Sequence, residues 1–112
     1  MSEPQSVGIE PAKAVDITTS VTIGERSIVS RILFKTLQGS VTLFAFDEGQ
    51  SLSEHTTPYG ALVQVLEGAL ELTVGGRLLV VHSGQMALMP AHVPHAVLAP
   101  AKTKWMLTML KE

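Results

Sequence analysis

Ala69-Leu-Glu-Leu-Thr-Val-Gly-Gly-Arg-Leu-Leu-Val-Val81 contains two adjacent glycines, Gly75 and Gly76, between two short apolar runs. The two central positions of a tight β-hairpin turn require a positive φ, which glycine adopts without a steric penalty. Leu70–Val74 and Leu78–Val81 are therefore predicted to pair as antiparallel strands. This hairpin is the clearest local indication that the chain folds as β-structure.

Short apolar runs alternate with turn residues over most of the sequence. Turns recur at intervals of roughly 8–12 residues, a spacing typical of β-sandwiches and barrels, and few windows hold an apolar stripe of helical period and length. The sequence therefore predicts an all-β domain. The predicted strands are Ala14–Ile23, Ser27–Thr36, Ser40–Asp47, Leu52–Thr56, Leu62–Leu66, Ala69–Val74, Arg77–Val81, Met86–Met89, His95–Leu98 and Lys104–Leu110.

The length of 112 residues allows one compact domain. Residues 1–12 contain few large apolar side chains and are predicted to be a flexible N-terminal lead-in, so residues 13–112 form the single barrel domain. Hydrophobic residues make up 46% of the chain and charged residues 16%, a balance that builds a core and excludes intrinsic disorder.

Composition also excludes several function classes. The chain has no cysteine, which excludes disulfides, thiolate metal ligands and a cysteine nucleophile. Its 8 basic and 10 acidic residues are scattered, so no basic surface for nucleic acid is expected. No apolar run is long enough to span a membrane, and the N-terminal region lacks the apolar segment of a secretory signal. We therefore expect a cytoplasmic protein that binds neither nucleic acid nor membranes.

The segment Ser40–Asp47 is apolar on both faces of its predicted strand. Such a strand must be covered on both sides, so something packs outside the barrel. Either the long N-terminal segment or a second subunit can cover it. A homodimer is the more economical explanation, and we expect one.

The chain has four histidines, and three of them lie next to turn-rich segments: His55, His92 and His95. The fourth, His82, ends a predicted hairpin strand and is expected to have no role in the site. The two blocks that carry the three histidines read Gly49-Gln-Ser-Leu-Ser-Glu-His55-Thr-Thr-Pro-Tyr-Gly-Ala-Leu-Val-Gln-Val-Leu-Glu-Gly68 and Gly84-Gln-Met-Ala-Leu-Met-Pro90-Ala-His-Val-Pro-His95.

These blocks resemble the paired motifs of the cupin superfamily, G-x5-H-x-H-x3-E-x6-G followed by G-x5-P-x-G-x2-H. The residues in register are Gly49, His55, Gly68, Gly84, Pro90 and His95. The resemblance covers residues 40–110 and is closest to small single-domain bacterial cupins. It implies a double-stranded β-helix, or jelly-roll barrel, that is usually dimeric. It also implies that His55 and His95 lie on facing strands and point into the barrel.

The sequence departs from the motif at two ligand positions, where Thr57 replaces the second histidine and Ala61 replaces the glutamate. The usual site in this superfamily holds iron, manganese, nickel or zinc with three imidazoles and a carboxylate. With His55 and His95 alone, we expect such a divalent metal to be held loosely. His92 lies in a proline-bracketed loop and is the best candidate for a third nitrogen, although a solvated loop position is the simpler interpretation.

Three functions remain open. The first, which we favour, is a small-molecule-binding cupin whose ligand occupies the barrel interior, with Thr57, Tyr59 and His92 as candidate ligand-binding residues. The second is a metal-dependent enzyme of the dioxygenase or isomerase type. The third is a metal-free structural or regulatory dimer in which the two imidazoles form a vestigial polar pair. The methionines Met86, Met89, Met106 and Met109 either line a soft apolar pocket or fill gaps in the core.

Overall fold

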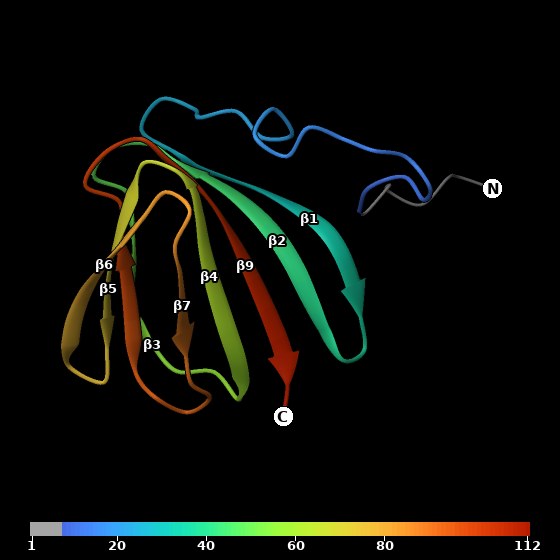
Figure 1. The fold of residues 1–112 in the computed structure, drawn as a ribbon. Coiled ribbons are helices and arrows are strands. Elements are labelled where there is room, and N and C mark those ends of the chain that lie inside the picture. Colours follow the sequence, from blue (N-terminus) through green and yellow to red (C-terminus); the bar gives the residue numbers. More distant parts are fainter. Residues whose placement is uncertain (1–7) are drawn as a thin grey trace.

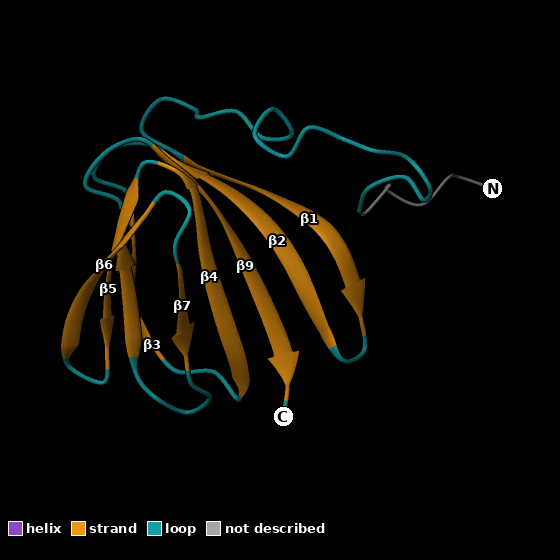
Figure 2. Ribbon diagram, in the orientation of Figure 1, coloured by secondary structure: helices purple, strands orange, loops and turns teal. Residues whose placement is uncertain are grey.

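The computed structural model describes residues 8–112, and these form nine strands without a helix. Five strands form one sheet in the order β1-β2-β9-β4-β7, and four form a second in the order β3-β8-β5-β6 (Figures 1 and 2). The prediction of an all-β jelly-roll barrel is confirmed. The strands are β1 (Ile28–Thr36), β2 (Gly39–Phe46), β3 (Ser51–His55), β4 (Tyr59–Glu67), β5 (Ala69–Val74), β6 (Arg77–His82), β7 (Met86–Met89), β8 (His95–Leu98) and β9 (Thr103–Lys111).

The predicted hairpin is confirmed. β5 and β6 pair antiparallel, with Val74 opposite Arg77. Gly75 and Gly76 have φ values of 57° and 81°, the left-handed conformation that a two-residue turn of this kind requires. The hairpin forms one edge of the four-stranded sheet, where β8 pairs with the other side of β5.

The predicted strand Ala14–Ile23 is wrong, because this segment forms turns and bends. The Ser20 hydroxyl donates a hydrogen bond of 2.7 Å to the Asp16 carbonyl, and the Ser20 amide donates one of 3.3 Å to the Ile17 carbonyl. Short polar side chains that bond to nearby backbone groups favour such turns over a ladder. Of the predicted lead-in, residues 1–7 lie outside the described part of the chain.

The N-terminal segment covers part of the outer face of β2. Val21 packs there in a small apolar cluster with Leu33, Leu43 and Ala45. The Arg31 guanidinium also donates a hydrogen bond of 3.2 Å to the Ser20 carbonyl, which holds the segment against β1. The N-terminal segment, one of the two covers expected for this strand, therefore packs on the outer face of β2. The homodimer stays a prediction.

The main core lies between the two sheets and is centred on Trp105 of β9, which is fully buried. Phe44 stacks on the indole with ring centroids 4.7 Å apart, and Phe46 packs edge-on at 5.4 Å. The register explains the stack, because Phe44 is the direct cross-strand partner of Trp105. Trp105 also lines the cavity described below, so the aromatic cluster supports one of its wall residues.

Two connections between strands meet at one end of the barrel. The His92 amide in the β7–β8 loop donates a hydrogen bond of 2.8 Å to the Thr57 carbonyl in the β3–β4 loop. The two predicted motif blocks are thereby joined beside the ends of β3 and β8. Among residues 8–112 we find no helix long and apolar enough to cross a membrane.

Candidate metal and ligand site

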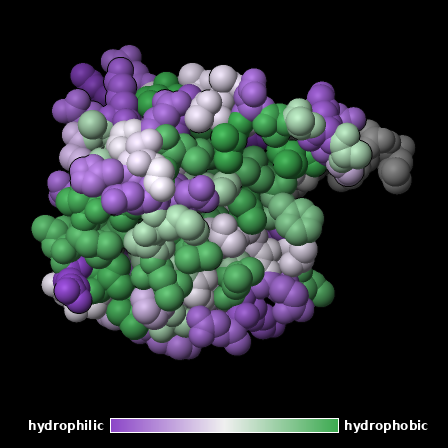
Figure 3. Space-filling model, viewed as in Figure 1, coloured by the Kyte–Doolittle hydropathy of each residue, from purple (hydrophilic) through white to green (hydrophobic). Residues whose placement is uncertain are grey.

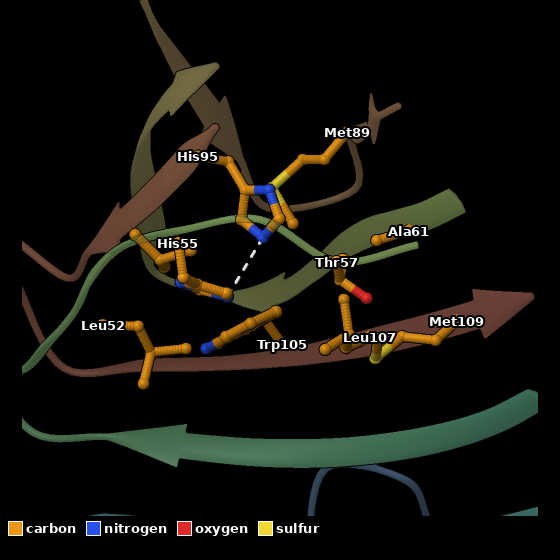
Figure 4. Close-up of a pocket in the computed structure, with 10 residues that line it drawn as sticks. Leu52, His55, Thr57, Ala61, Met89, His95, Trp105, Leu107 and Met109 are labelled. Atoms are coloured by element: carbon orange, nitrogen blue, oxygen red, sulfur yellow. Dashed lines mark hydrogen bonds between the residues drawn. The ribbon is translucent and has the colours of Figure 1, made fainter. Parts of the chain in front are cut away.

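His55 and His95 face each other across adjacent strands. His55 ends β3, His95 begins β8, and the two residues are direct cross-strand partners. Their Nε2 atoms are 3.1 Å apart, and their ring centroids are 4.3 Å apart (Figure 4). The two imidazoles that the sequence separates by 40 positions therefore meet as one pair.

A β-bulge on β3 sets the direction of His55. Leu52 pairs with Val97 and His55 pairs with His95, so three steps along β3 match two steps along β8. Strict alternation from Leu52, which lines the barrel interior, would turn His55 outward. The extra residue in the bulge returns His55 to the inner face, which is a frequent use of bulges near functional sites.

Backbone carbonyls fix the other nitrogen of each ring. His55 Nδ1 lies 2.7 Å from the Ser53 carbonyl oxygen, and His95 Nδ1 lies 3.1 Å from that of Val93. A carbonyl only accepts hydrogen bonds, so each Nδ1 carries the hydrogen and donates it. When both rings are neutral, both Nε2 atoms then present lone pairs to each other. A proton or a metal cation between the two nitrogens resolves this conflict.

The two rings differ in their exposure to solvent. His95 is 3% exposed, whereas His55 lies at the surface end of β3 and is exposed. One imidazole therefore anchors the pair in the barrel and the other borders its mouth.

A cavity of about 110 Å³ lies beside the imidazole pair (Figure 4). Its wall is mostly apolar, and its polar groups are the two imidazoles and the Thr57 hydroxyl. It is lined by Leu52, His55, Thr57, Ala61, Met89, His95, Val97, Trp105, Leu107 and Met109. The Nε1–H of Trp105 is buried and has no hydrogen-bond partner.

Of the three predicted ligand-binding residues, Thr57 lines this cavity, whereas Tyr59 and His92 do not. Tyr59 is half-buried at the start of β4, and the His92 side chain is exposed. His92 has a φ of 66°, and it occupies the position where the second cupin motif has glycine. A role for either residue in binding stays a prediction. Within residues 8–112, no group of three or more His, Asp or Glu side chains is arranged to hold a metal ion.

The four methionines that the sequence assigned either to a pocket or to the core occupy different positions in the structure. Met89 and Met109 line the cavity, whereas Met86 is 58% exposed and Met106 packs in the cluster outside β2. Met89 on β7 and Met109 on β9 are both direct cross-strand partners of Ala61 on β4. The motif position that lacks its carboxylate therefore has a thioether side chain on each side. The sequence alone did not reveal this, because it depends on the order β9-β4-β7.

Comparisons with known proteins agree with this fold. A family model described as "Cupin domain" matches residues 42–110, and the chain belongs to the cupin family. No curated protein matches the chain.

Solved structures of two bacterial proteins are about one-third identical to this chain over the aligned residues. A conserved protein of unknown function from Streptococcus pyogenes is 33% identical, with a TM-score of 0.89 and 98% of each chain covered. A cupin 2 conserved barrel domain protein from Leptotrichia buccalis is 34% identical over 84% of this chain and 46% of that chain, with a TM-score of 0.79. A cupin superfamily protein from Desulfitobacterium hafniense shares the fold at 20% identity, with a TM-score of 0.87 and coverage of 94% and 96%.

Proposed function

We propose that this protein binds a small molecule inside the barrel and that His55 and His95 hold a transition metal beside it. The observation that carries the proposal is the imidazole pair, whose Nε2 atoms face each other at 3.1 Å while both Nδ1 atoms donate to carbonyls. Metal-binding histidines commonly donate their second ring N–H to a backbone carbonyl in this way.

The spacing of the two Nε2 atoms suits a shared metal. Two nitrogens bound to one zinc at the usual 2.0–2.1 Å are about 3.4 Å apart in a tetrahedral shell and about 2.9 Å apart as neighbours in an octahedral one. The observed 3.1 Å lies between these values. The donor set therefore fits a metal but supplies only two nitrogen ligands, so we expect weak binding. A metal held there would act as a Lewis acid toward an oxygen of the ligand.

The cavity limits the size and polarity of the ligand. An apolar cavity of about 150 Å³ accommodates benzene, so the cavity of about 110 Å³ suits a somewhat smaller molecule. Its apolar wall favours a hydrocarbon body, and the Thr57 hydroxyl and imidazoles favour one polar group on that body. A short-chain carboxylate or carbonyl compound has this chemistry.

Metal titration tests the metal part of the proposal. We expect purified protein to carry less than one metal per chain, and added zinc, nickel or manganese to bind at one site. The double variant His55→Ala, His95→Ala should lose this binding. The matched control is His82→Ala, an exposed histidine on β6, which should retain it. Stoichiometric metal that survives both substitutions in the pair would remove the assignment.

A second experiment separates binding from catalysis. A panel of small acids, carbonyl compounds, sugars and thiols is tested with metal present, by thermal denaturation and by assays of turnover and oxygen consumption. A ligand that raises the melting temperature without being converted supports the binding function. Conversion of any compound that depends on His55 and His95 would favour a metal-dependent cupin enzyme instead.

A further inference from the structure

The donor groups around the imidazole pair are chemically soft. The cavity has no carboxylate or cysteine in its wall, and besides the two imidazoles its heteroatom side chains are Thr57, Met89, Met109 and Trp105. The indole N–H of Trp105 is a hydrogen-bond donor only, so it cannot be a metal ligand. A neutral hydroxyl is a weak ligand for a divalent ion, whereas a thioether sulfur binds soft cations. The two sulfur atoms are therefore the best additional ligands that the wall offers.

Their position follows from the sheet register. Met89 and Met109 both pair with Ala61, whose side chain is too small to occupy the space between them. All three residues line the cavity, so their side chains share its inner face. In Figure 4 the Met89 side chain extends toward the Nδ1 edge of the His95 ring, and Met109 lines the cavity from β9. Met89 is 2% exposed, which keeps its sulfur away from bulk solvent.

We propose that the metal held by His55 and His95 is Cu(I), with Met89 as its thioether ligand and Met109 as a second sulfur within the same cavity. This inference rests on the proposed function, because it assumes that the imidazole pair binds a metal. Thioether sulfur favours Cu(I), while carboxylate and water favour the harder ions such as manganese. Methionine has three rotatable bonds, so its sulfur can adjust to a metal without a change in the backbone.

Core packing is the alternative role for these two methionines. Packing alone asks only for an apolar side chain of similar volume, and leucine meets that requirement at a cost usually below about 1.5 kcal/mol. Metal binding asks for the sulfur atom itself. Substitution of methionine by leucine therefore separates the two roles, because it retains the volume and removes the ligand.

The test compares Cu(I) and Zn(II) affinities in anaerobic competition with chromophoric chelators. For Met89→Leu we expect Cu(I) affinity to fall roughly 10–100-fold, the range seen when a supporting group of a metal site is removed, with Zn(II) affinity little changed. The double variant Met89→Leu, Met109→Leu should lose more. The matched control is Met86→Leu, because Met86 also lies on β7 but is exposed on the outer surface. A sulfur shell in the copper X-ray absorption spectrum should be present in the wild type and absent in the double variant.

The possible results distinguish this inference from the function on which it rests. If Zn(II) binds through His55 and His95 but Cu(I) affinity is unchanged by both leucine substitutions, the copper assignment is wrong and the imidazole site stands. If neither ion binds in a manner that depends on the two histidines, the proposed function itself fails. Loss of Cu(I) and Zn(II) binding together in Met89→Leu, with folding retained by circular dichroism, would also overturn the sulfur-ligand assignment.

Discussion

At the scale of single residues, Thr57 is the most informative departure from the cupin motif. It lines the cavity beside the imidazole pair, at the position where the motif has its second histidine. The change Thr57→His should restore a third imidazole and raise zinc or nickel affinity by tenfold or more, since a third ligand completes a catalytic-type shell. Titration calorimetry of both proteins measures this. Lys35→His, at an exposed position on β1 in the other sheet, is the control and should leave affinity unchanged.

His92 provides a second test at this scale. Its φ of 66° is unfavourable for a residue with a Cβ, and glycine avoids that cost. We expect His92→Gly to raise the free energy of unfolding by about 1 kcal/mol, measured by urea denaturation. Because the His92 side chain is exposed and does not line the cavity, metal affinity should stay the same. A marked loss of affinity would show that His92 is the third nitrogen ligand that the sequence suggested.

At the scale of elements, Asp47 joins the end of β2 to the turn that precedes β1. Its carboxylate accepts hydrogen bonds from the Arg26 amide at 2.7 Å and the Glu48 amide at 2.9 Å. These bonds hold the pKa of Asp47 below its usual value of 3.8, with a smaller opposing effect from desolvation. A lowered pKa in the folded state means that the carboxylate stabilises the fold above that usual value and loses this effect as the pH falls through the folded-state pKa.

The expected result is therefore pH-dependent. Asp47→Asn should melt at a lower temperature than the wild type at pH 7, and the difference should shrink as the pH falls below about 3.8. Thermal melts between pH 7 and pH 3 measure it, with Glu48→Gln as the control at the neighbouring position. A difference that remained constant across this range would mean that the charge on Asp47 is not what stabilises the junction.

Sequence periodicity predicts the elements well where local chemistry dominates. The Gly75-Gly76 turn was predicted correctly because it depends only on the backbone conformation of these two residues, both of which have a positive φ. The bulge between Leu52 and His55 was not predicted, since it depends on which residues of β8 lie opposite β3. The prediction of a strand at Ala14–Ile23 was wrong for a related reason: polar side chains there bond to their own backbone instead of a neighbouring strand.

At the scale of the whole molecule, Trp105 is the largest fully buried side chain and connects the core with the cavity. We expect Trp105→Ala to lower the free energy of unfolding by about 3–5 kcal/mol, the usual cost of truncating a large buried aromatic residue. Trp105→Phe should cost far less, because it retains a stacking ring and removes the unpaired Nε1–H. Urea unfolding followed by circular dichroism compares the two. Equal losses would mean that the ring does not support the core.

The outer face of the five-stranded sheet is the surface through which we expect a homodimer to form. Met86, Leu88 and Leu110 there are 53–60% exposed, and Figure 3 shows apolar side chains gathered across the middle of the face in view. We expect light scattering to give twice the monomer mass of 12.0 kDa, and Leu88→Lys to shift the protein toward the monomer. Leu78→Lys, on the exposed face of β6 in the other sheet, is the control. A wild-type mass of 12.0 kDa at micromolar concentration would contradict the dimer.

The motif spacing in the sequence predicts the pairing of His55 with His95, but not what surrounds the pair. Thr57 was expected near it and lines the same cavity, whereas Tyr59 and His92 do not. The roles of Met89 and Met109 depend on strands that meet only after folding, so no window of sequence contains the information. The motif spacing thus predicts the two candidate ligands, and the tertiary register determines their neighbours.

Anomalous diffraction from crystals soaked with zinc would reveal whether the two imidazoles share a metal ion. We expect a peak within bonding distance of both Nε2 atoms, with each Nδ1 still donating to its carbonyl. A soaked crystal with full zinc sites elsewhere and none between His55 and His95, or with the two rings turned apart, would contradict it.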